Sequence, residues 1–180
     1  IIFFIILPLH TSRNLETTII ATVFIATYVL PLIILSILKQ SRVIESYHLI
    51  HNKERKYPLF FFILILYLMA TLIKNNDTTI DLALFFYGST ISLFLVIFLL
   101  YKNIKVSLHL IGISGMLTFF IVFSYLYKIN NLLIISALFI LLGTVASSRL
   151  HLKAHNKKEI SLGFLIGVTG QILAYFIYSI

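Results

Sequence analysis

Long apolar segments alternate with short polar ones along the chain, and this pattern predicts membrane-spanning helices. Most of the apolar segments approach the roughly 20 residues that a helix needs to cross a bilayer. We expect a truncated first span followed by further spans, at 1–9, 17–38, 58–73, 82–101, 109–126, 132–146 and 160–178. Pro31 predicts a kink inside the second span, and Pro58 is expected in the first turn of the third.

The composition leads to the same fold class. Of the 180 residues, 60% are hydrophobic and 11% are charged, and the mean hydropathy is +1.05. These values lie far from those of a soluble domain, so we expect an all-α fold, a polytopic transmembrane helical bundle of about six to seven spans. No Gly-, Ser- or Pro-rich linker divides the sequence, which predicts a single transmembrane domain over residues 1–180. The absence of cysteine excludes disulfides and thiolate chemistry.

Charge is distributed unevenly between the two ends of the predicted spans. If the chain crosses the bilayer at each span, the polar segments 39–57, 102–108 and 147–159 share one face. Of the 14 lysines and arginines, only Arg13, Lys74 and Lys128 then belong to the other face. The histidines on or near the first face are His48, His51, His109, His151 and His155. Titratable side chains are therefore predicted to gather at one membrane surface.

The net charge of +8 does not by itself indicate nucleic acid, because the cations lie in short loops. There they are expected to meet lipid head groups or an anionic substrate. The positive-inside rule accounts for the lysines and would place this face in the cytoplasm. It does not account for the histidines, nor for an arginine and two histidines at the ends of spans.

These residue types match the needs of covalent phosphate-ester cleavage. Cations, preferably arginine, bind the phosphate oxygens, and a neutral imidazole can act as nucleophile. A second group protonates the leaving oxygen, and a carboxylate fixes the tautomer of the nucleophile. The predicted polar face offers all four.

Two segments resemble signatures of the type 2 phosphatidic acid phosphatases, which are integral-membrane lipid phosphatases. The stretch from Ser148 and Arg149 through His155 to Glu159 is similar to S-R-x5-H-x3-D, with glutamate in the last position. The stretch Val106-Ser107-Leu108-His109 is similar to P-S-G-H in its serine and histidine. The cations of residues 53–56, ahead of a proline, stand in the place of the first signature, K-x6-R-P. The likeness covers about residues 39–170 and extends to small, divergent lipid-phosphatase-like proteins of Bacteroidetes.

The resemblance implies a phosphatidic-acid-phosphatase-like fold and a lipid phosphatase that requires no metal and no other cofactor. His155 would attack phosphorus and form a phosphohistidine, Glu159 would bind its other ring nitrogen, and His109 would protonate the leaving group. The phosphate oxygens would be bound by Arg149, Ser107, Ser148, and Lys53 or Arg55. The substrate would be a lipid phosphate or diphosphate of the undecaprenyl diphosphate, phosphatidylglycerol phosphate or phosphatidic acid type. The expected location is a bacterial inner membrane, with the active face toward the periplasm.

Three alternatives remain open at this point. One is a non-catalytic membrane subunit that keeps the fold, binds anionic lipid and joins other membrane proteins. A helix through His151, His155 and Glu159 would place all three on one face, as in a metal site. The segment Gly112-Ile113-Ser114-Gly115 resembles the G-x-S-G of rhomboid proteases, but we interpret its glycines as close-packing residues, like Gly163, Gly167 and Gly170.

Overall fold

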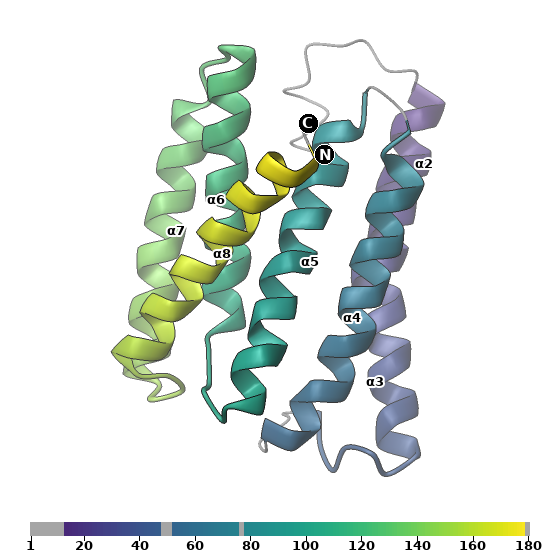
Figure 1. Cartoon of the computed structure of the whole chain (residues 1–180), viewed down its shortest axis with the longest axis vertical. Coiled ribbons are helices and arrows are strands. Elements are labelled where there is room, and N and C mark those ends of the chain that lie inside the picture. The colour runs from purple at the N-terminus through teal and green to yellow at the C-terminus, as the bar shows by residue number, and fades with distance from the viewer. Residues whose placement is uncertain (1–12, 48–51, 76–77, 179–180) are drawn as a thin grey trace. The chain divides into compact units, whose positions relative to one another are not determined.

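The computed structural model describes residues 13–47, 52–75 and 78–178, and the regular secondary structure in this part of the chain is helical, joined by short connectors (Figure 1). The helical elements are α2 (Arg13–Phe24), η1 (Ile25–Val29), α3 (Leu30–Gln40), α4 (Asn52–Ile73), α5 (Ile80–Tyr101), α6 (Leu108–Tyr127), α7 (Leu132–His151) and α8 (Lys157–Tyr178). Within the described residues, 6 helical segments are long and apolar enough to cross a membrane, the first being the continuous helix Arg13–Gln40. The protein is therefore an all-α integral membrane protein. The span expected at 1–9 lies outside the described residues.

Two helix boundaries differ by five residues or more from those predicted from hydropathy. Pro58 lies inside α4, which begins at Asn52 and includes the cations ahead of the proline. Helix α7 continues beyond Ala146 to His151, so Ser148 and Arg149 lie on its last turn and not in a connector. Basic side chains are favourable at a helix C-terminus, where they face the negative end of the helix dipole. The helix therefore extends past the point at which its apolar character ends.

A π-helical segment lies directly before Pro31, where the sequence predicts a kink. Pro31 has no backbone N–H and so removes one donor from the helix interior. Directly before it, residues Ile25–Val29 adopt a π-helix, and the Leu30 N–H bonds the carbonyl of Ile25, five residues back. Such wider turns accommodate a disrupted hydrogen-bond ladder without ending the helix. One continuous span thus results from α2, η1 and α3.

Packing divides the chain into two compact units, residues 1–86 and 87–180. In the first, α4 packs against η1 and α3. In the second, α6 packs against both α7 and α8, and α8 runs obliquely across α6 (Figure 1). The single domain expected for residues 1–180 stays a prediction.

Glycines allow α6 and α8 to approach closely. A Cβ added at Gly163 would lie 2.7 Å from the Ser107 carbonyl oxygen, and one at Gly167 would collide with Ser114 Oγ and the Ile111 carbonyl. Small residues at such crossings let two membrane helices pack backbone to backbone. The packing role predicted for Gly112 is wrong, because this glycine is exposed and an added Cβ would meet nothing within 4 Å. The glycine contacts place the start of α8 beside the start of α6.

Candidate active site

Polar side chains of the second unit gather where α6 begins, α7 ends and α8 begins. The Ser107 N–H donates to the Glu159 carbonyl over 3.3 Å and so joins the starts of α6 and α8. Arg149 Nη2 lies 2.8 Å from His109 Nε2 and joins the end of α7 to the start of α6. We call Ser107, His109, Arg149, His155 and Glu159 the His–Arg cluster. Its members come from two stretches that are about 40 residues apart in the sequence, 107–109 and 149–159.

The contact between Arg149 and His109 fixes the direction of one hydrogen bond. A guanidinium group only donates, so His109 Nε2 must accept. A neutral His109 ring then carries its hydrogen on Nδ1. His155 is bonded to Glu159, and the carbonyl of Glu159 accepts from the N–H of Ser107, two residues before His109. The two imidazoles predicted to flank a phosphate therefore share one end of the second unit.

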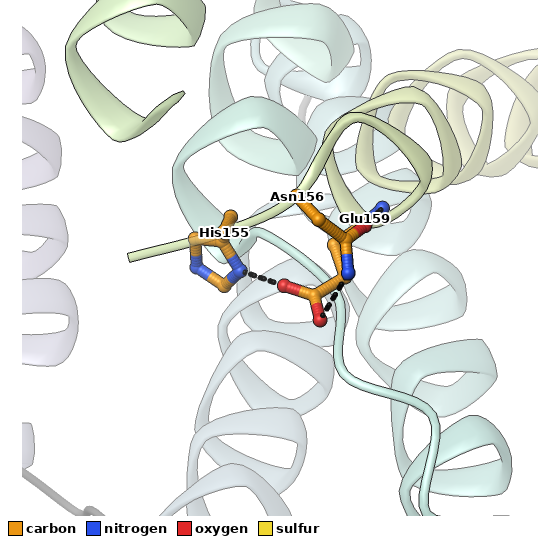
Figure 2. Close-up of polar contacts among 3 residues, drawn as sticks. All are labelled: His155, Asn156 and Glu159. Atoms are coloured by element: carbon orange, nitrogen blue, oxygen red, sulfur yellow. Dashed lines mark hydrogen bonds and ion pairs between the residues drawn. The ribbon is translucent and has the colours of Figure 1, made fainter. Parts of the chain in front are cut away.

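His155 and Glu159 form the second bonded pair of the cluster (Figure 2). His155 Nδ1 lies 2.7 Å from Glu159 Oε2, and the two side chains are only 12% and 18% exposed. Because a carboxylate accepts, His155 Nδ1 is the donor. In a neutral ring this leaves the lone pair on Nε2, the state that a nucleophilic imidazole requires.

The geometry that joins His155 to Glu159 is not the continuous helix considered from the sequence. Helix α7 ends at His151, Lys153 adopts a left-handed conformation with φ of 51°, and α8 begins only at Lys157. His155 therefore precedes α8 and contacts Glu159 across the helix start. His151 does not share a helical face with them, so the metal arrangement considered for these three residues is wrong. Among the described residues, no group of three or more His, Asp or Glu side chains has a metal-binding arrangement.

Asn156 also bonds Glu159, and it is not among the site residues predicted from the sequence. Its Oδ1 accepts from the Glu159 N–H over 2.9 Å, and its Nδ2 donates to Glu159 Oε1 over 3.1 Å (Figure 2). Asn156 is thus the N-cap of α8, and Glu159 occupies the third helical position. The N-x-x-E spacing is the signal in the sequence that indicates this cap. Both carboxylate oxygens of Glu159 are consequently bonded.

Replacing Asn156 by alanine is expected to lower the free energy of unfolding by about 1 kcal/mol, because the first turn of α8 loses its cap. Chemical unfolding of the protein in detergent micelles measures this change. Asn156→Ser is the matched control, since serine also caps helices and should retain most of the stability. Equal losses in the two variants would contradict the capping role.

Ser107 is fully buried at the N-cap position of α6. It is 0% exposed, its side chain makes no capping hydrogen bond, and its Oγ has no hydrogen-bond partner among the described residues. A buried hydroxyl without a partner is destabilising, and native proteins rarely retain one without a use for it. It adjoins the start of a helix, where free N–H groups and the helix dipole favour an anion.

Charge in the second unit is strongly one-sided. Glu159 is the only acidic side chain in residues 87–180, and it is bonded to His155. Every lysine and arginine of this unit except Lys128 lies in or beside the connectors around the cluster. Exposed members of this group are Lys102, Lys105, Lys153, Lys157 and Lys158. An anion would therefore meet a positive potential at this surface.

The remaining predicted residues lie apart from these contacts or in the other unit. Ser148 is exposed on the last turn of α7, next to Arg149. Lys53 and Arg55 belong to the first unit, where α4 begins at Asn52. Their expected part in phosphate binding stays a prediction, as does that of Ser148. His48 and His51 lie outside the described residues.

The fold and the cluster define an all-α polytopic membrane protein with a basic, imidazole-containing site at one end of its second unit. No protein-family model matches the sequence, and no curated protein or solved structure is significantly similar to it.

Proposed function

We propose that the protein is a metal-independent lipid phosphatase, similar to the type 2 phosphatidic acid phosphatases, that acts through a phosphohistidine. The observation that carries the proposal is the bonded pair of His155 and Glu159 beside the bonded pair of Arg149 and His109. Together these residues supply a nucleophile, a tautomer-fixing carboxylate, an arginine and a second imidazole. Substrates of the proposed class are phosphatidic acid, phosphatidylglycerol phosphate and undecaprenyl diphosphate. The active face is proposed to lie toward the periplasm of a bacterial inner membrane.

In the proposed reaction, His155 Nε2 attacks phosphorus and the bond from phosphorus to the leaving oxygen breaks. The ring becomes cationic, and Glu159 stabilises this charge through the hydrogen bond from Nδ1. His109 gives a proton to the leaving oxygen. Water then attacks the phosphohistidine, His109 takes a proton from that water, and inorganic phosphate leaves.

The contact between Arg149 and His109 has a role in this scheme. Arg149 donates to the ring nitrogen of His109 that would otherwise carry the transferable proton. Phosphate oxygens are stronger acceptors for a guanidinium, because both hydrogen bonds of a bidentate pair are charge-assisted. A bound phosphate would therefore draw Arg149 away from His109 and leave Nε2 able to take up a proton.

Ser107 is proposed to donate its buried hydroxyl to a phosphate oxygen. The hydroxyl has no other partner among the described residues, and it lies at the start of α6. Fixed donors of this kind stabilise negative charge as it develops, without reorganisation during the reaction. The bound anion would thus satisfy the hydroxyl, and the hydroxyl would help to orient the anion.

The decisive experiment measures phosphate release by the purified protein in the presence of a metal chelator. Phosphatidic acid, phosphatidylglycerol phosphate and undecaprenyl diphosphate are offered separately in mixed micelles. We expect release from at least one of them, unaffected by the chelator and inhibited by vanadate, which mimics the five-coordinate phosphorus of the transition state. Vanadate binding without phosphate release from any of the substrates would contradict the enzymatic function. It would favour a non-catalytic membrane subunit that binds anionic lipid.

A further inference from the structure

An apolar groove lies between α7 and α8 in the second unit, with α6 as its floor. Its volume is about 380 Å³. Its walls are formed by Leu110 of α6, by Leu142, Gly143 and Ala146 of α7, and by Ile160, Ser161, Phe164 and Leu165 of α8, so that Ser161 carries the one polar side chain. The volume falls within the range of roughly 300–1,000 Å³ that is typical of small-molecule sites. It is therefore large enough to bind part of a ligand.

At one end of this groove, the lining residues are close neighbours in the chain of members of the His–Arg cluster. Leu110 directly follows His109, and Ile160 directly follows Glu159. Ala146 lies about one helical turn before Arg149 on the last part of α7. From there the wall residues continue along α7 to Leu142, roughly 10 Å from Arg149 at 1.5 Å per residue. The groove thus leads from the cluster into the apolar part of the spans.

Small side chains on α7 keep the groove open. A Cβ added at Gly143 would meet nothing within 4 Å, in contrast to Gly163 and Gly167, whose added Cβ atoms would collide with α6. Gly143 is therefore not required by packing between helices. The space beside Gly143 and Ala146 is left free for a molecule from outside the chain.

We propose that this groove binds the hydrocarbon chain of a lipid whose phosphate lies in the His–Arg cluster. This proposal rests on the proposed function and specifies how its substrate is recognised. The basic His–Arg cluster matches the phosphate of such a lipid, and the apolar groove matches its hydrocarbon chain. Arg149 and the exposed lysines attract an anionic head group, and the only carboxylate of this unit is bonded to His155. The apolar walls match a hydrocarbon chain and offer little to a polar molecule.

Photolabelling of the reconstituted protein tests the proposal directly. The probe is a non-hydrolysable phosphonate analogue of phosphatidic acid with a diazirine in its acyl chain, present at low density in phosphatidylcholine vesicles. We expect labelling of peptides that contain 142–146 and 160–165, as identified by mass spectrometry. Arg149→Ala should remove most of this labelling, because the head group loses its cationic partner.

Filling the groove should displace the chain. Gly143→Leu is expected to lower labelling of these peptides at least about tenfold, since small changes in an apolar pocket have effects of that size. Ala146→Leu serves as a second variant should the first fail to fold. Gly112→Leu is the matched control, because Gly112 is an exposed helical glycine outside the groove whose added Cβ also meets nothing. It should leave the labelling unchanged.

Two results would overturn the inference. One is equal labelling of the groove by a phosphatidylcholine probe with the same diazirine chain, which would mean that any bilayer lipid fills it. The other is undiminished labelling in both filled variants. The proposed function fails separately, when the phosphonate probe labels the groove but no lipid phosphate is hydrolysed. If hydrolysis occurs and Gly143→Leu leaves the KM for the lipid unchanged, only the groove assignment fails.

Discussion

Replacing His155 by alanine is expected to lower phosphate release from a lipid phosphate by at least about a thousandfold, as removal of a catalytic nucleophile does in other hydrolases. The variant should fold, because His155 precedes α8 and its backbone is not part of either neighbouring helix. Initial rates of phosphate release measure the loss. A second measurement is covalent labelling with a ³²P-labelled substrate, which should give an acid-labile phosphoprotein with the native chain and none with the variant.

His151→Ala is the matched control for this prediction. His151 is exposed and lies on the last turn of α7, so it shares the surface and the charge of the region without forming the bond to Glu159. Activity close to that of the native chain is expected. Equal losses in the two variants, or an undiminished covalent label in His155→Ala, would refute the nucleophilic role of His155.

Replacing Gly167 by valine is expected to lower the free energy of unfolding by about 3 kcal/mol, the upper part of the range for overpacked sites. A side chain at this position would collide with Ser114 Oγ and the Ile111 carbonyl and lie 3.0 Å from the Gly115 nitrogen. Two of these are backbone atoms of α6, which cannot move without displacing the helix. Denaturant titration in micelles, followed by circular dichroism, measures the change.

Gly112→Val provides the comparison for this stability effect. It introduces the same β-branched residue into α6 at a position where an added Cβ meets nothing within 4 Å. The intrinsic preference of valine for helix is thus common to both variants, and the difference between them reports the contact of α6 with α8. Similar unfolding midpoints for the two variants would show that the helices do not cross at Gly167.

The helical fold and most of its spans follow from hydropathy, because a bilayer requires apolar helices of nearly fixed length. The errors occur where polar residues continue a helix. Arg149 and His151 extend α7 beyond its apolar part because cations are favourable at a helix C-terminus. Pro58 was expected to begin a helix, yet α4 already includes the residues before it. Hydropathy reports where a chain is buried in lipid, and hydrogen bonding decides where a helix ends.

In the candidate site, the local contact follows from the sequence pattern, whereas the long-range contacts do not. The spacing of His155 and Glu159 predicts a contact, and the structure contains it, although a helix cap and not a continuous helix produces it. The bond between His109 and Arg149 joins residues 40 apart in the chain, and no local pattern encodes such a pair. The Ser107 hydroxyl lacks a partner among the described residues because of tertiary burial, which a local pattern does not report. Gly143 resembles the packing glycines in sequence and differs from them only in its surroundings.

Glu159 contributes to the structure through two separable parts of the same residue. Its carbonyl accepts from the Ser107 N–H, and its carboxylate accepts from His155 and from the Asn156 amide. A main-chain link of this kind is independent of the residue type at position 159. Substitutions at position 159 should consequently alter the electronic state of the His155 imidazole while the main-chain link between α6 and α8 remains. The reactivity of the imidazole can therefore vary at this position without loss of that link.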